Sequence, residues 1–267
     1  MTTTPAVPDA AVPLSGAGQM PLLGFGTWQI TGDLATEATA WALEAGYRHV
    51  DTAAVYGNER EVGAALRGGP PRDDIFITTK VPPDRKESPR QTLEHSLEML
   101  GTDHVDLWLI HWPPDRGVAL DTWKALVEAQ QQRLATAIGV SNYTLEQIDE
   151  LAQATGVTPA VNQIPWSPLR FDSALVAGHR ERGVVLEGYS ALRGGTLKHP
   201  VITEIAERIG RTTAQVIIRW HLQHEIVVIP KSREQERIRS NADVAGFELA
   251  TADMAALDAL GGEGSDR

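Results

Sequence analysis

Short runs of valine, isoleucine and leucine alternate along the chain with longer segments that have one apolar and one polar face. This alternation predicts parallel strands that helices bury on both faces. The expected strands cover residues 23–26, 49–51, 75–80, 105–110, 136–140, 160–163, 184–187 and 226–229. Eight strand–helix units without a Pro/Gly/Ser-rich linker predict a single (β/α)8 TIM barrel domain over residues 1–267, because about 250 residues is the usual size of that fold.

The predicted helices carry signals for where they begin and end. Ser88-Pro89-Arg90-Gln91 combines a cap residue, a first-turn proline and a capping-box glutamine, and Gly101 follows the last turn of that helix. Thr144 and Gln147 repeat the capping box, with Gly156 as the stop. These signals support the division of the chain into strand–helix units.

The two ends of the chain depart from this pattern. Residues 12–23 place Gly16 and Gly18 between apolar positions, which predicts an N-terminal β-hairpin across the barrel floor. Residues 1–11 and 261–267 are mostly small and polar, so we expect both ends to be loose. The last predicted helix, residues 251–260, is followed by only a short tail.

Charge and composition argue against a nucleic acid or a membrane as the binding partner. The chain has 267 residues and a formal net charge of −11, which would repel a nucleic-acid backbone or an anionic membrane surface. It has no cysteine, no basic N-terminal region followed by an apolar block, and no apolar run near the roughly 18 residues that a membrane span needs. We therefore expect a soluble cytoplasmic protein with a small-molecule partner and neither a nucleic-acid nor a membrane partner.

Four polar residues follow or end three consecutive predicted strands. Asp51 ends the second strand and Tyr56 lies in the loop after it, Lys80 ends the third strand, and His111 ends the fourth. Each alone has a structural interpretation: the aspartate caps a turn, the tyrosine fills a rim, and a lone histidine packs in the core. Together they bring a carboxylate, a phenol, an ammonium and an imidazole to the barrel mouth, where barrel enzymes keep their catalytic groups.

These residue types suit proton donation to a carbonyl oxygen while a hydride reaches the carbonyl carbon. A free tyrosine has a pKa of about 10, and the positive charge of Lys80 is expected to lower that pKa. Asp51 would hold the ammonium in place, and His111 would orient or polarise the carbonyl. No histidine-rich metal spacing and no thiol offer another chemistry.

The later strands supply candidate cofactor residues. Ser141 and Asn142 follow the fifth strand and Gln163 ends the sixth, where they bind a carboxamide or cap a helix. Tyr189 follows the seventh strand in a glycine-containing loop, where an aromatic face suits stacking on a flat ring. Residues 229–241 form a basic cluster at a helix start, which is either a phosphate site or a solvated helix face.

These residues resemble the aldo-keto reductase family, and the resemblance covers nearly the whole chain. The stretch Gly46-Tyr47-Arg48-His49-Val50-Asp51-Thr52-Ala53, with Glu59 and Val62-Gly63 after it, is similar to one family signature. Ile229-Pro230-Lys231-Ser232, with Arg237 and Ser240-Asn241, is similar to another near the end of the chain. The resemblance implies a (β/α)8 oxidoreductase of the bacterial type with a short C-terminal tail that uses NADPH.

The resemblance also assigns roles by position. It makes Asp51, Tyr56, Lys80 and His111 the catalytic tetrad, with Tyr56 as the general acid in reduction. It implies that Tyr189 stacks under the nicotinamide ring. The other implied cofactor contacts are Ser141, Asn142 and Gln163 for the nicotinamide amide, Ser190 and Leu192 in the loop after Tyr189, Lys231, Ser232 and Arg237 for the 2′-phosphate, and Asn241 for adenine. A 2′-phosphate site favours NADPH over NADH.

The chain departs from the family after Tyr189. Ala191 and Arg193 stand where proline and glycine are frequent, so Arg193 either adds a phosphate contact or points to solvent. The short tail replaces a longer loop that covers the substrate in many members. This difference predicts a more open pocket and broader substrate acceptance.

Tryptophans at the mouth define the expected substrate pocket. Trp28, Trp112 and Trp166 lie where the family places apolar walls, which suit aldehydes, ketones or α-keto esters. The other four tryptophans fall inside predicted helices or strands and are expected in the core: Trp41, Trp108, Trp123 and Trp220. The leading hypothesis is a monomeric NADPH-dependent carbonyl reductase, and the alternative is an NADPH-binding regulatory or scaffold barrel with little turnover.

Overall fold

A curled sheet of eight parallel strands forms the centre of the computed structural model, which describes residues 8–82 and 88–262. The strands follow chain order around the sheet, from β3 to β10. Their bounds are β3 Phe25–Gly26, β4 His49–Asp51, β5 Phe76–Val81, β6 Val105–Ile110, β7 Ala135–Ser141, β8 Val161–Pro165, β9 Val185–Tyr189 and β10 Val227–Val228. Each strand is therefore parallel to the one before it and joined to it by a helical crossover, as the sequence pattern predicts.

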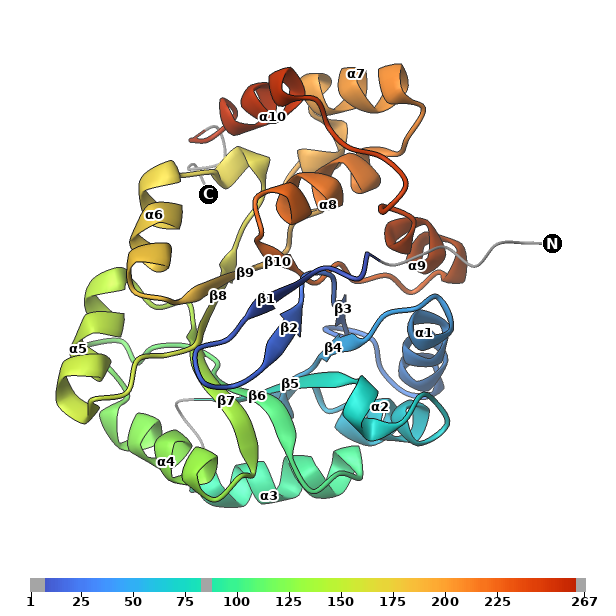
Figure 1. The fold of residues 1–267 in the computed structure, drawn as a ribbon. Coiled ribbons are helices and arrows are strands. Elements are labelled where there is room, and N and C mark those ends of the chain that lie inside the picture. The colour runs from blue at the N-terminus through green and yellow to red at the C-terminus, as the bar shows by residue number, and fades with distance from the viewer. Residues whose placement is uncertain (1–7, 83–87, 263–267) are drawn as a thin grey trace.

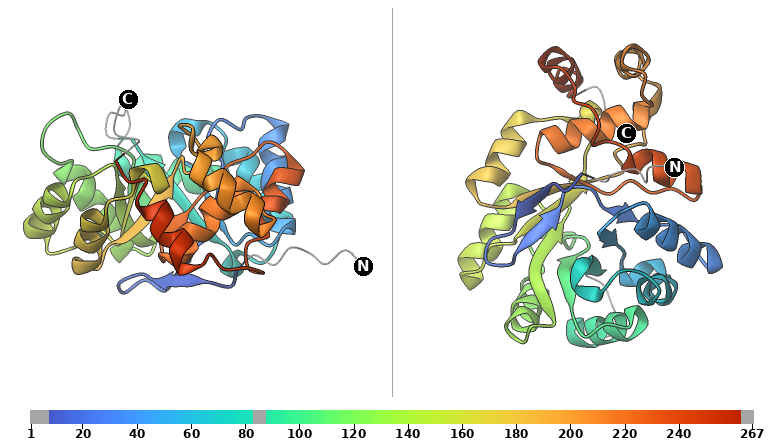
Figure 2. Two further views of the ribbon diagram at one scale, coloured as in Figure 1. Left: turned by 90° about the horizontal axis from the view of Figure 1, so that it is seen from above. Right: turned by 45° about the vertical axis from the view of Figure 1, so that its right-hand side comes forward.

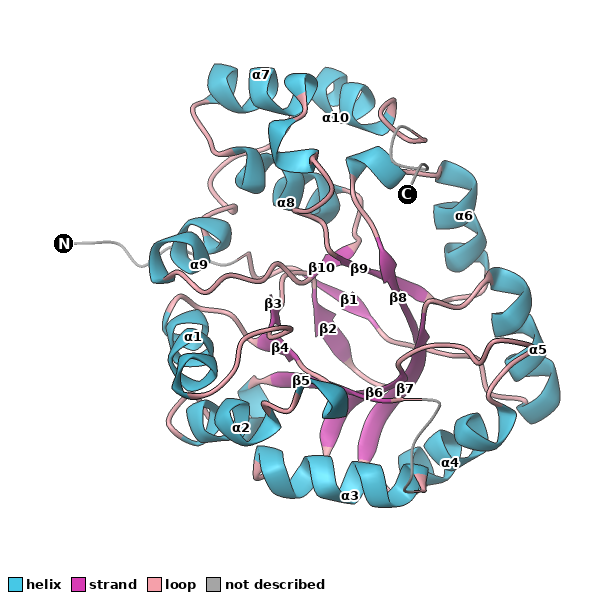
Figure 3. Cartoon of the chain, turned by 180° about the vertical axis from the view of Figure 1, so that it is seen from behind, coloured by secondary structure: helices cyan, strands magenta, loops and turns pink. Residues whose placement is uncertain are grey.

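Hydrogen bonds join the two edges of this sheet into a barrel. The amide N–H of Gly24 donates to the carbonyl oxygen of Val228 at 2.9 Å, and the N–H of Val228 donates to the carbonyl oxygen of Leu22 at 2.8 Å. Leu23 and Val228 form a parallel bridge at the same place. Figures 1 and 3 look at this ring of strands from opposite sides. The predicted (β/α)8 barrel is confirmed.

Helices form a ring around the strands (Figure 1). Their bounds are α1 Asp33–Glu44, α2 Glu59–Arg67, α3 Pro89–Leu100, α4 Leu120–Gln131, α5 Leu145–Thr155, α6 Ser173–Glu181, α7 Pro200–Ile209, α8 Thr213–Gln223, α9 Gln235–Ala242 and α10 Thr251–Asp258. The predicted capping boxes are present: Ser88 caps α3 with Gln91, and Thr144 caps α5 with Gln147. Helices α7 and α10 pack against each other outside the ring. No helix of the described residues is long and apolar enough to cross a membrane.

The N-terminal hairpin lies across one end of the barrel, as Figure 2 shows in its left view. Its strands are β1 Ala11–Pro13 and β2 Gln19–Pro21, paired antiparallel. Met20 points into the core and is fully buried, so the hairpin seals the end at which the parallel strands begin. The hairpin was predicted. The predicted loose segment, residues 1–11, was too long, because Ala11 already pairs with Pro21. The remainder of that end, residues 1–7, and residues 263–267 lie outside the described part of the chain.

The strand bounds differ from the prediction at both ends of the barrel. Strand β3 begins two residues later than predicted, at Phe25. The predicted bounds of β4 and β6 match the structure, whereas β8 and β9 each run two residues further. Strand β10 is shorter than expected and ends at Val228. Pro230 follows closely and has no N–H to donate to a ladder, and the bond from the Ile229 N–H to the Gly188 carbonyl oxygen is long at 3.4 Å.

Candidate active site

Three of the four predicted catalytic residues open on one cavity at the carboxyl ends of the strands. Asp51 is the last residue of β4, Tyr56 ends a short 3-10 turn after it, and His111 directly follows β6. All three line a cavity of about 1060 Å³. Lys80, in β5, is fully buried behind them and reaches the cavity only through its neighbours.

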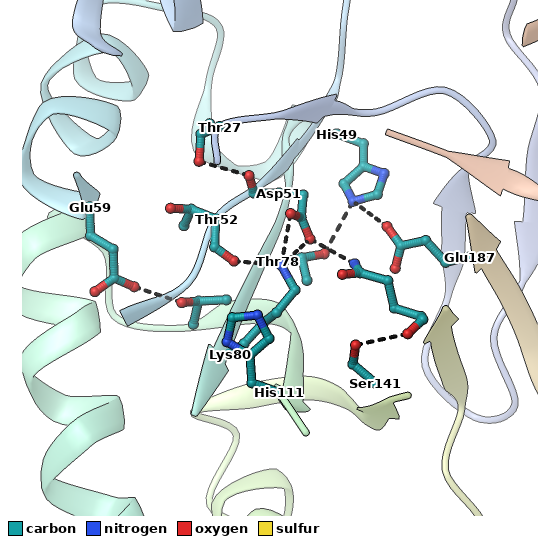
Figure 4. A network of polar contacts seen from close by, with 12 residues as sticks. Thr27, His49, Asp51, Thr52, Glu59, Thr78, Lys80, His111, Ser141 and Glu187 are labelled. Carbon is teal, nitrogen blue, oxygen red and sulfur yellow. Dashed lines mark hydrogen bonds and ion pairs between the residues drawn. The ribbon is translucent and has the colours of Figure 1, made fainter. Parts of the chain in front are cut away.

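Asp51 and Lys80 form a buried ion pair, drawn in Figure 4. The Lys80 ammonium donates to both carboxylate oxygens of Asp51, at 2.7 and 2.6 Å, and to the carbonyl oxygen of Thr52 at 2.9 Å. Burial alone would lower the pKa of Lys80, but the negative charge of Asp51 and the Tyr56 phenol outweigh burial and raise that pKa. The ammonium therefore keeps its positive charge at the base of the cavity.

The phenol of Tyr56 lies near both the ammonium and the imidazole. The Lys80 nitrogen is 5.3 Å from the centroid of the Tyr56 ring, and the His111 ring centroid is 5.7 Å away at an edge-on angle. Burial raises the pKa of Tyr56, and the charge of Lys80 works against that rise. Lys80 thus acts in the predicted direction, but the expected net fall in the pKa of Tyr56 is not found, because the cost of burying a phenolate is larger.

His111 is held as a neutral imidazole. Burial and the nearby Lys80 ammonium lower the pKa of His111 to about 2. The indole ring of Trp112 stacks on the imidazole, with ring centroids 3.6 Å apart and planes 14° apart. Asn142 donates to the backbone carbonyl oxygen of His111 at 3.2 Å. A neutral, fixed imidazole can hydrogen-bond a carbonyl group without carrying charge into the cavity.

The predicted amide-binding residues come together on one side of the cavity. Ser141 donates to the backbone carbonyl oxygen of Gln163 at 2.8 Å, and the Asn142 amide donates to the Ser141 hydroxyl at 3.0 Å. The Tyr189 hydroxyl donates to the Asn142 amide oxygen at 2.8 Å. The Gln163 amide nitrogen donates to Asp51 at 2.8 Å, so this group is tied directly to the ion pair.

The loops after β9 and β10 line the other end of the same cavity. Ser190 and Leu192 of the first loop, Ser232 of the second and Asn241 of the following helix α9 are among its walls. The basic residues that line this end are Arg193, Lys231, Arg233 and Arg237. Burial lowers the pKa of Lys231, and the charges of Arg233 and Arg193 lower it further. Cations that repel one another in this way are stabilised by an anion.

Arg193 and Arg233 both contact the loop after β3. The sequence did not predict these contacts. The Arg193 guanidinium lies over the Trp28 ring, 5.0 Å from the ring centroid, rather than pointing freely to solvent. Arg233 donates from Nε to the carbonyl oxygen of Gln29 at 3.1 Å. These contacts join the loop after β3 to the loops after β9 and β10 at the cavity wall. Only the basic character of residues 229–241 signalled Arg233 in advance, and no signal pointed to Gln29.

The start of α8 is another part of the cavity wall that was not predicted. Thr212, Thr213 and Ala214 line the cavity. Thr212 caps α8 through a capping box with Gln215. The sequence Thr212-Thr213-Ala214-Gln215 could have signalled this helix start, and a helix start favours anions.

The tryptophans divide between the mouth and the core. Trp28 and Trp112 line the cavity and are 42% and 43% exposed. Trp166 is 2% exposed, is absent from the cavity wall, and packs edge-on against Phe171. Its placement in the substrate pocket is therefore wrong, because its ring turns into the hydrophobic core. The four tryptophans expected in the core pack there, with Trp41 only partly buried: Trp41, Trp108, Trp123 and Trp220.

Comparisons with known proteins agree with this geometry. The model of the Aldo/keto reductase family matches residues 22–261. An aldo-keto reductase from Mycolicibacterium vanbaalenii is 44% identical, covering 97% of this chain and 94% of its own. The crystal structure of an aldo/keto reductase from Brucella melitensis is 40% identical, covers 94% of this chain and 99% of its own, and superposes with a TM-score of 0.90.

A third relative carries a cofactor. The crystal structure of a Bombyx mori aldo-keto reductase in complex with NADP is 32% identical, with a TM-score of 0.86, and covers 95% of this chain and 93% of its own. The family match and the Mycolicibacterium vanbaalenii and Brucella melitensis proteins extend over nearly all of the barrel. This chain belongs to the aldo/keto reductase family.

Proposed function

We propose that the protein reduces aldehydes and ketones to alcohols with NADPH, and that Tyr56 donates the proton. The observation that carries the proposal is the position of the Tyr56 phenol. It lies beside the Lys80 ammonium and the His111 imidazole, at the base of a cavity whose other end is basic.

Each residue of the group has a separate task. A carbonyl oxygen bound between Tyr56 and His111 accepts a hydrogen bond from each, which polarises the carbonyl bond. As negative charge develops on that oxygen, the Tyr56 hydroxyl transfers its proton to it. The Lys80 ammonium stabilises the phenolate that remains, and Asp51 fixes the ammonium at 2.6 to 2.7 Å. NADPH, when bound, supplies the hydride to the carbonyl carbon.

The cavity wall fits a phosphorylated dinucleotide. Four cations line one end of the cavity in a chain whose formal net charge is −11. Arg237 pairs with Glu234 at 3.0 Å, whereas burial and the charges of Arg233 and Arg193 lower the pKa of Lys231, so an anion at this end would stabilise these cations. Lys231, Ser232 and Arg237 would hold the 2′-phosphate, and Asn241 would contact adenine. Ser141, Asn142 and Gln163 would hold the nicotinamide amide, with Tyr189 against the ring. Ser190 and Leu192 would line the path of the pyrophosphate.

The substrate side of the cavity is apolar. Four large hydrophobic side chains that are exposed in the described structure lie around its mouth: Trp28, Val55, Trp112 and Leu197. Apolar walls of this kind favour aromatic or aliphatic aldehydes and ketones over charged substrates. The monomeric state and cytoplasmic location inferred from the sequence stay predictions.

The test is a turnover assay. Purified protein is mixed with NADPH and a panel of apolar aldehydes and ketones, and the absorbance of the reduced nicotinamide is followed. Formation of the alcohol in step with NADPH consumption supports the proposal. If the protein binds NADPH but consumes none with any member of the panel, the scaffold hypothesis replaces it.

A further inference from the structure

A second buried carboxyl group lies below the catalytic ion pair. Glu187 is in β9, fully buried, and pairs in register with Gln163 of β8 and Val227 of β10. Its Oε1 atom is 3.8 Å from Nε2 of His49. Figure 4 marks this contact. The tasks proposed above for the catalytic residues do not use Glu187.

Within residues 8–82 and 88–262, neither carboxyl oxygen of Glu187 has a hydrogen-bond partner. Another buried glutamate provides the contrast: Glu59 accepts a bond from the Thr79 hydroxyl at 2.6 Å and from the Ser96 hydroxyl at 3.0 Å. A buried carboxylate without donors is far more costly than one with two. The surroundings of Glu187 therefore favour its neutral acid form.

The His49 imidazole fills the space beside Glu187. The His49 ring packs against Gly24, where a Cβ atom would lie 2.5 Å from the ring nitrogen Nδ1. Nε2 of His49 is 3.1 Å from the Thr78 hydroxyl. Burial, with the charge of Lys80, lowers the pKa of His49 to about 3. A neutral imidazole gives Glu187 no cation to pair with.

The charged groups that face Glu187 come from β4 and β5. Burial and the carboxylate of Asp51 raise the pKa of Glu187 to about 8, and the nearby Gln163 amide and the charge of Lys80 oppose this shift. Its register neighbours Gln163 and Val227 carry no charge. The protonation of Glu187 thus depends on the same two residues that set the acidity of the phenol.

Building on the proposed function, we propose that Glu187 is a positioning residue for the reduction, active as a neutral acid. In that form it leaves the Lys80 ammonium with one carboxylate partner, Asp51. As a carboxylate it adds a second negative charge, which offsets the field of Lys80 at the Tyr56 hydroxyl and makes that hydroxyl a weaker acid.

Two electrostatic interactions connect Glu187 to Tyr56 through Lys80. The charge of Glu187 contributes to the raised pKa of Lys80, and the charge of Lys80 lowers the pKa of Tyr56 against the effect of burial. Glu187 does not line the cavity, so its ionisation acts on proton donation without touching substrate or cofactor. Reduction is expected to slow as the solution becomes alkaline enough to ionise Glu187.

The test compares the pH profiles of kcat for wild type, Glu187→Gln and Glu59→Gln with saturating NADPH. Glutamine has nearly the shape of the neutral acid but cannot ionise. We expect kcat of the wild type to fall about tenfold between about pH 7 and about pH 9, and kcat of Glu187→Gln to change by less than about twofold. Glu59→Gln should follow the wild type, because burial raises the pKa of Glu59 but its two hydroxyl donors oppose that rise, and Glu59 lies outside the cavity wall. Identical profiles for wild type and Glu187→Gln would overturn the proposal.

A second measurement covers the case in which Glu187→Gln does not fold. Infrared spectra of wild type and Glu59→Gln, each with NADP bound, should show the carbonyl band of a protonated carboxyl group near pH 7. That band should disappear as the pH passes about 8. Its absence at pH 7 overturns the proposal. Failure of the proposed function looks different, because wild type would then turn over no carbonyl substrate at any pH.

Discussion

The Lys80 ammonium lies 2.7 and 2.6 Å from the two carboxylate oxygens of Asp51, and almost no solvent reaches either side chain. A buried ion pair of this kind is costly to break, since removing one charge leaves the other uncompensated. The pair fixes a positive charge at the base of the cavity, where the Tyr56 ring lies over it.

Replacing Asp51 by asparagine should therefore affect stability and turnover together. The unpaired Lys80 should lower the free energy of unfolding by about 3 to 5 kcal/mol, and burial, no longer opposed by the carboxylate, should lower its pKa. Urea unfolding and kcat for carbonyl reduction measure the two effects. Asp149→Asn is the control, because the Asp149–Arg182 pair is partly exposed and should contribute less than about 1 kcal/mol. Equal losses for the two variants would contradict the prediction.

Replacing Tyr56 by phenylalanine should remove the proton donor and little else. We expect kcat for carbonyl reduction to fall by about 10²- to 10⁴-fold, with NADPH affinity within about twofold of wild type. Stopped-flow absorbance and fluorescence titration of NADPH measure these quantities. Tyr143→Phe is the matched control, since that hydroxyl is buried outside the cavity wall. Full activity of Tyr56→Phe would assign the acid to another residue.

The sequence predicted the barrel because its signals are local. The bounds of β4 and β6 could be read from apolar runs, and the caps at Ser88 and Thr144 from their spacing. Strand ends in a parallel barrel meet at one mouth, so placing Asp51, Tyr56 and His111 along the chain also placed them near one cavity.

The features that were missed depend on contacts between distant parts of the chain. Glu187 of β9 approaches His49 of β4, and Arg193 contacts Trp28 from the loop after β9; in both cases the two residues are distant in the sequence. Neither contact leaves a periodic signal in the sequence. Trp166 was misplaced for a related reason, because its position after β8 does not reveal that the ring turns inward against Phe171.

Removing the charges of Lys231 and Arg237 should discriminate between the two nicotinamide cofactors. The double alanine variant should weaken NADPH binding by about 100-fold and NADH binding by less than about threefold, because only NADPH carries a 2′-phosphate. Arg239→Ala is the control, since Arg239 lies outside the cavity wall and is 3.9 Å from Glu44. Titration of protein fluorescence with each cofactor gives the dissociation constants. Equal weakening of both would place the phosphate site elsewhere.

The contact between Arg193 and Trp28 should contribute to cofactor retention. Its loss in Arg193→Ala opens the mouth, and a cation–π contact at an exposed site is worth about 0.5 to 1 kcal/mol. We expect NADPH and NADH to dissociate about two- to fivefold faster, by a similar factor for each. Stopped-flow displacement measures the rates. A loss confined to NADPH would instead make Arg193 a ligand of the 2′-phosphate.

Acid should destabilise the fold mainly through three of its buried imidazoles. Burial is the main cause that lowers the pKa of His49 to about 3, of His111 to about 2 and of His221 to about 4, from 6.5. The unfolded chain then binds more protons than the folded chain below about pH 6.5, so stability is present above that pH and is lost as the pH falls toward these values. Glu187 makes a contribution of opposite sign between pH 4.5 and about pH 8, because its pKa is raised in the folded state. In that range the folded chain binds one more proton at Glu187 than the unfolded chain does, which offsets one of the three protons that the histidines take up on unfolding.

The net effect of these four groups is a fall in unfolding free energy of about 2 kcal/mol between about pH 6 and about pH 5, measured by urea denaturation. Replacing His221 by glutamine removes one proton from the uptake that accompanies unfolding. The glutamine amide can still reach the Ile217 carbonyl oxygen, which His221 contacts at 2.7 Å. This variant should reduce the slope by about 1.4 kcal/mol per pH unit at most. An unchanged slope would show that His221 is already protonated in the folded protein, against the pKa that its burial produces.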